Sequence, residues 1–358
     1  MLYTKTKPEF FSETRKVVDA YFKYHNLSKK GNWVSYLDTI VTVVIFIGLI
    51  ISPFIFHLSP IWHCIAYAIA GALCLGRIGF IAHEAMHGSF SKNEKVNLLV
   101  GRMFDVLAHV SSFLWGDKKY GKHTNHHKFT NIDKMDDDIK TNGVFRFAPH
   151  QPWSPKHRFQ WIYAQFLYPL LYNQWVFRSD FQKMRSKKVG ATVIKEIPVK
   201  EKIIIIASKI LHIMVYLVIP YFVFGLWEMM FSYICLTWPC GSVISNIFQP
   251  AHVQSKAQFP SPDPKTGGVE NNWAITQVQT TANFGVKSIL LTWFTRGLNF
   301  QVPHHLFPEI HSRHYRKVNR IVKRKCRKFN VQYNEYPTFF SGWLAHENWL
   351  FEIGKKPA

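Results

Sequence analysis

Four long runs without a charged residue constrain the fold of this chain more than any other feature. They hold 18 to 21 residues each and cover Thr39–Phe56, Leu58–Gly76, Ile210–Trp227 and Met229–Gln249. About 20 apolar residues in a helix cross the roughly 30 Å hydrocarbon core of a bilayer, and helices of soluble proteins rarely stay uncharged for that length. The sequence therefore predicts an all-α integral membrane protein with four transmembrane helices, at about 39–56, 58–76, 207–227 and 229–249.

The distribution of positive charge predicts the orientation of these helices. The chain has 44 Lys and Arg against 22 Asp and Glu, and Arg178–Lys202 alone holds eight basic and three acidic residues. Lys and Arg concentrate in cytoplasmic loops, so the pattern favours two hairpins, with both termini and this loop in the cytoplasm. A fifth uncharged run, residues 159–177, contains Pro169 and several amides. Crossing the membrane there would move the basic loop outside, so we expect this run at the interface or within the protein.

The remaining sequence divides into an arm, a main domain and a tail. Residues 1–38 are predicted to form a basic cytoplasmic arm, 39–340 the main domain, and 341–358 a C-terminal tail. Within the main domain, 83–202 and 251–340 should form a cytoplasmic helical cap. The first apolar run begins near residue 39, behind a basic segment, so no signal peptide is predicted. Nothing resembles a nucleic-acid-binding module, and the positive charge is better explained by lipid headgroups or an acidic substrate carrier.

Three histidine clusters indicate a metal centre. His83 and His87 are four residues apart, His123, His126 and His127 share one helical face, and His304 and His305 follow Gln301 at the same spacing. All three clusters fall on the predicted cytoplasmic side. Neutral imidazole suits iron, zinc and copper, and seven rings exceed the needs of one ion. The pattern thus predicts a nitrogen-rich site for two metals, unlike the carboxylate-bridged di-iron sites of soluble helical bundles.

The motifs around these clusters resemble those of one enzyme family. "HEAMHGSF", "HTNHHKFTNIDKMDDDI" and "GLNFQVPHHLFP" are similar, in order and hydropathy, to the three histidine boxes of the membrane fatty acid desaturases, and the likeness covers about residues 40–340. The resemblance implies a non-haem di-iron centre that uses dioxygen and two external electrons to remove two hydrogens from an acyl chain. It implies eight metal ligands: His83, His87, His123, His126, His127, His252, His304 and His305.

Several further side chains are expected to support the ligands. Gln301 stands where other desaturases have a histidine, and in this family that exchange is typical of the front-end branch, which desaturates between an existing double bond and the carboxyl end. We expect the Gln301 amide to orient His305 rather than to bind metal. Asp137 and Asp138 are candidate partners for imidazole N–H groups, and Asn246 and Gln249 are candidates for holding a water.

Two departures from the family pattern qualify this interpretation. Front-end members usually have an acidic residue at the position of Pro303, which fits the first turn of a short helix instead. The chain has no His-Pro-Gly-Gly haem motif of a fused cytochrome b5 domain. The electrons are therefore expected from a separate donor such as ferredoxin or cytochrome b5 with its reductase. The acyl substrate could ride on CoA, on a carrier protein or on a membrane lipid.

Two kinds of alternative remain open at this point. A hydroxylase, ketolase or acetylenase of the same family would carry the same histidine boxes. A zinc-dependent membrane hydrolase or a metal-binding receptor would use the histidines without redox chemistry. The favoured hypothesis is an O2-dependent acyl desaturase with two iron ions.

Overall fold

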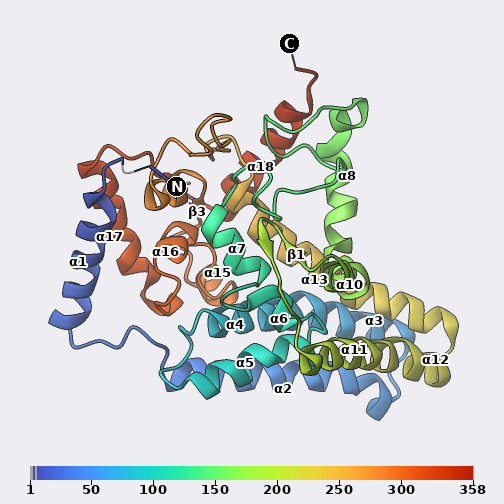
Figure 1. Ribbon diagram of the computed structural model, residues 1–358. Coiled ribbons are helices and arrows are strands. Elements are labelled where there is room, and N and C mark those ends of the chain that lie inside the picture. Colours follow the sequence, from blue (N-terminus) through green and yellow to red (C-terminus); the bar gives the residue numbers. More distant parts are fainter. Residues whose placement is uncertain (1–2, 5, 358) are drawn as a thin grey trace. The chain divides into compact units, whose positions relative to one another are not determined.

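The computed structural model describes residues 3–4 and 6–357, and these residues are mostly helical (Figure 1). They form two compact units. One contains residues 31–121 and 165–246 and is called the apolar unit here; the other, the histidine unit, contains the described residues of 1–30, 122–164 and 247–357. The predicted helical class is confirmed. The structure adds two small sheets that the sequence did not predict, antiparallel β1 (Lys188–Val189) with β2 (Thr192–Val193), and parallel β3 (Ala282–Phe284) with β4 (Asn334–Tyr336).

Three helical segments that begin in the apolar unit are long and apolar enough to cross a membrane. The first is α2 (Trp33–Phe56), with a mean hydropathy of 2.6. The second, Pro60–Met86, runs through α3 (Pro60–Ile69), the π-helical η1 (Ala70–Leu75) and α4 (Gly76–Met86). The third, Val199–Phe224, comprises α11 (Val199–Ile213), η5 (Met214–Val218) and α12 (Ile219–Phe224).

The fourth predicted segment also forms a helix, α13 (Leu226–His252). This helix does not reach the apolar character of the other three among the described residues. Its sequence includes Glu228 near the start and Asn246 and Gln249 near the end, which lower its hydropathy. Three candidate spans are therefore shown, and a fourth stays a prediction.

The first two helical segments extend beyond the predicted spans because of one ion pair. Asp38 and Arg77 interrupt the uncharged runs and so set two of the predicted ends. In the structure both lie inside helices, and the Arg77 guanidinium reaches the Asp38 carboxylate at 2.6 Å. Arg77 is 1% exposed. A charge buried among apolar helices is tolerated when it is paired in this way. Consequently the second segment continues as far as Met86 and carries His83 within it.

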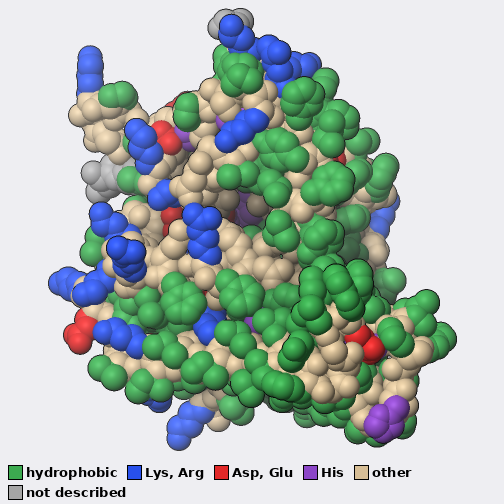
Figure 2. Space-filling model, turned by 90° about the vertical axis from the view of Figure 1, so that its right-hand side faces the viewer, with side chains coloured by type: hydrophobic (Ala, Val, Ile, Leu, Met, Phe, Trp, Pro, Cys, Tyr) green, Lys and Arg blue, Asp and Glu red, His purple; other side chains and the backbone are tan. Residues whose placement is uncertain are grey.

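The surface of the apolar unit suits a lipid environment. Large apolar side chains are exposed along the candidate spans, among them Ile55 and Phe56 of α2, Ile61 of α3 and Phe222 of α12. Figure 2 shows hydrophobic side chains over much of the lower part and the right-hand side of the face it presents. Contiguous apolar surface of this kind is unusual for soluble proteins and marks contact with a membrane or a partner.

The run 159–177 is broken rather than continuous. It passes through α8 (Gln160–Leu167), a 3-10 turn at Tyr168–Leu170 that contains Pro169, α9 (Leu171–Gln174) and the π-helical η4 (Trp175–Ser179). Proline removes a backbone donor and clashes with the preceding turn, so a straight spanning helix is not expected here. After η4 the chain continues into α10 (Asp180–Ser186). Elsewhere in the apolar unit, α5 (Glu94–Val106) packs along α4, and the short α6 (Ser112–Gly116) follows α5.

The histidine unit has its own hydrophobic core. Its helices are α1 (Glu9–Tyr24), α7 (Lys122–Phe129), α14 (Trp273–Gln279), α15 (Ile289–Phe294), α16 (Gln301–Leu306), α17 (Tyr315–Lys328) and α18 (Phe339–Gly354), with 3-10 turns η2 (Pro155–Phe159) and η6 (Ser312–His314). Helices α1 and α17 lie side by side (Figure 1), and α16 packs against α14 and α17. Phe10, Val278, Phe300 and Val322 are among the residues buried between them. The arm is thus helical over α1, and the strongly basic stretch 312–328 forms η6 and α17.

Candidate metal centre

Two short helices of the histidine unit carry five of the predicted ligands. Helix α7 presents His123, His126 and His127, and all three rings are buried. Helix α16 begins at Gln301 and carries His304 and His305, with Pro303 in its first turn as expected. Both histidines of α16 are almost inaccessible, at 2% and 1% exposed. The helical spacing therefore turns these rings inward, into the unit's interior.

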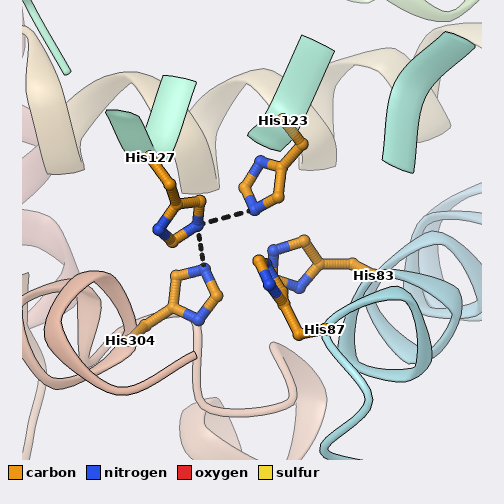
Figure 3. A group of neighbouring side chains, drawn as sticks. All are labelled: His83, His87, His123, His127 and His304. Carbon is orange, nitrogen blue, oxygen red and sulfur yellow. Dashed lines mark hydrogen bonds between the residues drawn. The ribbon is translucent and has the colours of Figure 1, made fainter. Parts of the chain in front are cut away.

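A first set of rings consists of His123, His127 and His304 (Figure 3). Nε2 of His127 lies 2.8 Å from Nε2 of His123 and 3.0 Å from Nε2 of His304. Two nitrogens that bind one ion at about 2.1 Å in tetrahedral geometry are about 3.4 Å apart. The three nitrogens thus lie close enough together to share one ion.

A second set consists of His126, His252 and His305. Their ring centroids are 4.6 to 5.1 Å apart, and one nitrogen of each lies within 4.8 Å of the others. His252 ends α13, so this set joins three segments of the histidine unit that are distant in sequence. The two sets are adjacent, since the rings of His127 and His305 stack at 4.2 Å. The arrangement accordingly offers two neighbouring nitrogen-lined positions.

His126 is oriented by carboxylates. Its Nδ1 lies 2.9 Å from Asp136 and 3.2 Å from Asp138, and both distances allow Nδ1–H to donate. Burial lowers the pKa of His126, but the two carboxylates outweigh burial and raise the pKa above its ordinary value. Lys122 pairs with Asp138 at 2.5 Å and holds this carboxylate in place. A carboxylate behind a histidine fixes the tautomer and leaves Nε2 free to bind a metal.

His305 is oriented by a neutral amide. Its Nδ1 lies 2.7 Å from Oε1 of Gln277, which also accepts a hydrogen bond of 2.9 Å from Thr130. Because an amide oxygen can only accept, Nδ1 of His305 carries the proton. Nε2 of His305 is then a bare lone pair, buried and without a hydrogen-bond partner among the described residues. Burial first, and then the neighbouring histidines, hold the pKa of His305 well below its usual range.

His252 completes the second set with the same tautomer. Its Nδ1 lies 3.4 Å from the backbone carbonyl of Thr280, so this nitrogen is the donor. Burial, followed by the proximity of His126, lowers the pKa of His252 to about 3. The charge of Asp138 and, to a smaller extent, the neighbouring side chain of Gln301 act in the opposite direction. His252 is therefore a neutral ring at physiological pH, which is the form that binds metal.

His304 of the first set is held by a tyrosine. Its Nδ1 lies 3.1 Å from the hydroxyl of Tyr315, the first residue of α17, which is 3% exposed. Gly297, with φ at +75°, comes so close that a Cβ there would meet Cδ2 of Tyr315 at 3.0 Å. The tyrosine ring is thus confined between its own helix and the loop before α16.

His83 and His87 belong to the apolar unit. His83 lies on α4 and His87 follows at its end, with ring centroids 4.8 Å apart (Figure 3). Trp115 of α6 packs against the His83 ring at 5.6 Å. The predicted helical pairing of these two rings is thus present within that unit.

The remaining candidates differ in their surroundings. The carboxylates that contact His126 are Asp136 and Asp138, both in the acidic run that follows the second histidine cluster. Gln301 lies beside His252. The amide that contacts His305 is that of Gln277, whereas the sequence predicted that Gln301 would orient this ring. The remaining three candidates are Asn246, which donates to the carbonyl of Ser242 at 2.9 Å, the half-buried Gln249, and the half-buried Asp137.

Sequence reasoning missed Gln277, Thr130 and Tyr315. Gln277 lies in "WAITQVQTTANF", outside the three histidine motifs. Thr130 comes three residues after His127, and Tyr315 is the first residue of α17. A neutral amide or hydroxyl in a sequence does not indicate contact with a metal ligand, because polar residues are common in and near helices. Their position beside an imidazole emerges only when the segments are folded together.

The donor atoms of both sets fit metal ions bound by neutral imidazole. All three rings of the second set are protonated on Nδ1 and turn Nε2 inward, and a bare Nε2 of His305 would be costly to bury without a partner. Imidazole of this kind suits iron as well as zinc and copper. The chemistry of the donor set therefore fits two metals, and the choice among metals depends on the kind of protein.

Comparison with known proteins supplies that information. The fatty acid desaturase family model matches residues 59–337. The sn-1 linoleoyl-lipid 6-desaturase of Synechocystis sp. is 32% identical over 343 residues, which cover 94% of this chain and 93% of the relative. The enzyme with the same name from Arthrospira platensis is 31% identical, with 97% and 93% covered. The acyl-lipid (8-3)-desaturase of Physcomitrium patens is 29% identical, with 97% and 72% covered. The chain belongs to the fatty acid desaturase family and is an oxidoreductase that acts on fatty acyl chains.

Proposed function

We propose that the protein is a front-end acyl-lipid desaturase with two iron ions, one on each histidine set. The observation that carries the proposal is the pair of adjacent sets, His123–His127–His304 and His126–His252–His305, whose nitrogens converge on two positions. His83 and His87 are proposed to complete the ligands of the first ion. Gln301 is proposed to steady His252 rather than to bind metal, and Asp138 to steady His126.

Iron would supply the redox chemistry by which dioxygen and two electrons remove two hydrogens from an unactivated acyl chain. Written in full, R–CH2–CH2–R′, O2, two electrons and two protons give R–CH=CH–R′ and two waters. The chain's own residues keep this chemistry controlled. The rings of His304 and His305 are 2% and 1% exposed, so bulk water is excluded from them. Tyr315 and Gln277 bind the Nδ1 atoms of these rings and hold each Nε2 in position before the substrate arrives.

The front-end assignment draws on Gln301 and on the relatives. Two relatives are named linoleoyl-lipid 6-desaturases, and the sixth carbon of a linoleoyl chain lies between the carboxyl end and its first double bond. Several others are named acyl-lipid desaturases, which favours a lipid as the acyl carrier over CoA or a carrier protein. We therefore propose that the substrate is a membrane lipid whose acyl chain is already unsaturated.

The proposed topology has four spans in two hairpins, with α13 as the fourth. Three candidate spans and the basic segment 178–202 support it, because a cytoplasmic position for that segment agrees with the positive-inside rule. Both termini, the cap at 83–202 and 251–340, and the metal centre would face the cytoplasm. A separate electron donor could then reach the centre from that side.

The test is expression in a host that makes only monounsaturated acids, fed linoleic acid, with double-bond positions read by gas chromatography and mass spectrometry. A new double bond on the carboxyl side of the existing pair is expected. New bonds solely on the methyl side would refute the front-end assignment. Hydroxylated, ketonised or acetylenic products would favour the alternative activities of the same family.

A further inference from the structure

One face of η6 and α17 carries an uninterrupted row of exposed cations. The row consists of Arg313, Lys317, Arg320, Arg324 and Arg327, and all five side chains are exposed. Their spacing of four, three, four and three residues follows the helical repeat, so they line one face. At 1.5 Å per residue the row is about 20 Å long, which is long enough to contact another protein along several side chains.

These five cations have no acidic partner, in contrast to three lysines of the same helix. On the same helix, Lys323 pairs with Glu335 at 2.6 Å, and Lys325 and Lys328 both pair with Glu13 at 2.8 Å. Within the described part of the chain, no carboxylate pairs with any member of the row. Glu335 and Glu13 thus offset part of the charge on the flank of α17, whereas the face with the row stays strongly positive.

The opposite face of α17 is already occupied. Val318, Ile321, Val322 and Cys326 are buried in the core of the histidine unit, together with Phe10 and Val302. A helix that lies in a membrane surface inserts an apolar face between the lipids. Because the apolar face of α17 packs inside the protein, the cationic row can attract an acidic surface but cannot anchor in a bilayer.

Helix α17 is also in direct contact with the metal centre. Its first residue, Tyr315, lies between Arg313 and Lys317 in sequence, and its hydroxyl is 3.1 Å from Nδ1 of His304. One buried side chain therefore connects the end of the cationic row with a proposed iron ligand. No other exposed cationic row with this helical spacing is present among the described residues.

We propose that the exposed cationic face of α17 is the docking surface for an acidic electron-carrier protein, with Tyr315 and His304 lying between carrier and metal. The inference rests on the proposed function, in which each double bond formed requires two electrons from outside. Two reduced one-electron carriers would dock in turn, each would be oxidised, and the two electrons would enter the balance given above. Complementary charge would speed their encounter and make it sensitive to salt.

The test compares two variants with equal change in charge, in full-length protein held in nanodiscs of neutral lipid. Arg320→Glu with Arg324→Glu reverses the centre of the row. The control, called the loop variant, combines Lys156→Glu in η2 with Lys265→Glu in a loop, and so reverses two exposed cations elsewhere in the same unit. Binding of an acidic [2Fe–2S] ferredoxin and of soluble cytochrome b5 is measured by calorimetry at several salt concentrations. The row variant should bind the preferred carrier on the order of tenfold more weakly and with a flatter salt dependence, and the loop variant within about twofold of wild type.

Two further measurements separate docking from the enzyme's activity and from misfolding. Arg320→Gln with Arg324→Gln, which removes charge without reversing it, should show an intermediate loss of binding. Product formation is then measured with the carrier and with a small chemical reductant, and the row variant should lose rate only with the carrier. Equal binding by the row and loop variants would overturn the proposal, as would binding of the row to anionic lipid vesicles but to neither carrier. Absence of product with both reductants, despite normal carrier binding, would instead contradict the proposed function.

Discussion

Oε1 of Gln277 accepts a hydrogen bond of 2.7 Å from Nδ1 of His305, and this bond assigns the ring its tautomer. With the proton fixed on Nδ1, Nε2 is available inside the second histidine set. The contact also joins α14 to α16, so a residue outside the three histidine motifs determines how one of their rings can bind. Partners of this kind typically change metal affinity by about 10- to 100-fold when they are removed.

Gln277→Leu should therefore lower iron retention, by about 10- to 100-fold in affinity. Leucine fills a similar volume but cannot accept the proton on Nδ1, so His305 would lose its orientation. Iron per chain is measured after dialysis against graded chelator. Gln279→Leu, on the same helix and bonded to Asn271 instead, is the matched control and should retain wild-type iron. Equal loss in both variants would point to a general disturbance of α14.

Gln301→Ala distinguishes a supporting amide from a metal ligand. Because the Gln301 side chain lies beside His252 in the second set, its removal should leave about two irons per chain and slow turnover by about tenfold. His252→Ala, in contrast, should lose iron from the second set. Metal content and rate are measured together for both variants. If Gln301→Ala loses as much iron as His252→Ala, the amide coordinates metal.

The sequence predicts the elements of this protein better than their ends or their cross-contacts. The four uncharged runs fall in helical segments, and three of these segments are candidate spans. Two of the segments continue past Asp38 and Arg77, because these charges form a buried ion pair that a linear pattern does not show. Helical spacing correctly grouped His123 with His127. It could not separate Gln277 from Gln301 as the partner of His305, since that choice depends on how α14 packs against α16. The parallel pairing of β3 with β4, about 50 residues apart, had no local signal.

Lys209→Met should destabilise the apolar unit by about 3–5 kcal/mol. Lys209 and Asp180 are 4% and 2% exposed and pair at 2.6 Å, so methionine would leave a buried carboxylate without its cation. The apparent melting temperature in detergent measures the effect. Adding Asp180→Asn removes the orphaned charge, keeps an acceptor for the backbone N–H of Ser111, and should restore most of the loss. A double variant no more stable than the single one would contradict this account of the pair.

Acid should destabilise the histidine unit partly through His346. This ring is fully buried and bonds to the Val253 carbonyl at 2.6 Å, and burial lowers its pKa from 6.5 to about 4. Between those pH values the unfolded chain binds a proton that the folded chain does not, so stability is lost as pH falls, by about 3 kcal/mol in all. His346→Gln can still donate to the carbonyl but does not titrate. Its melting temperature should fall less than that of wild type between pH 6.5 and 4, and parallel curves would exclude this role.

The most direct test of the central claim is elemental analysis of the protein purified from native cells grown with sufficient metal. Two histidine sets that serve a desaturase predict about two iron atoms per chain and little zinc, with iron lost from variants of either set. About two zinc atoms per chain and no iron would contradict the account, and would favour a zinc hydrolase or a metal-binding receptor instead.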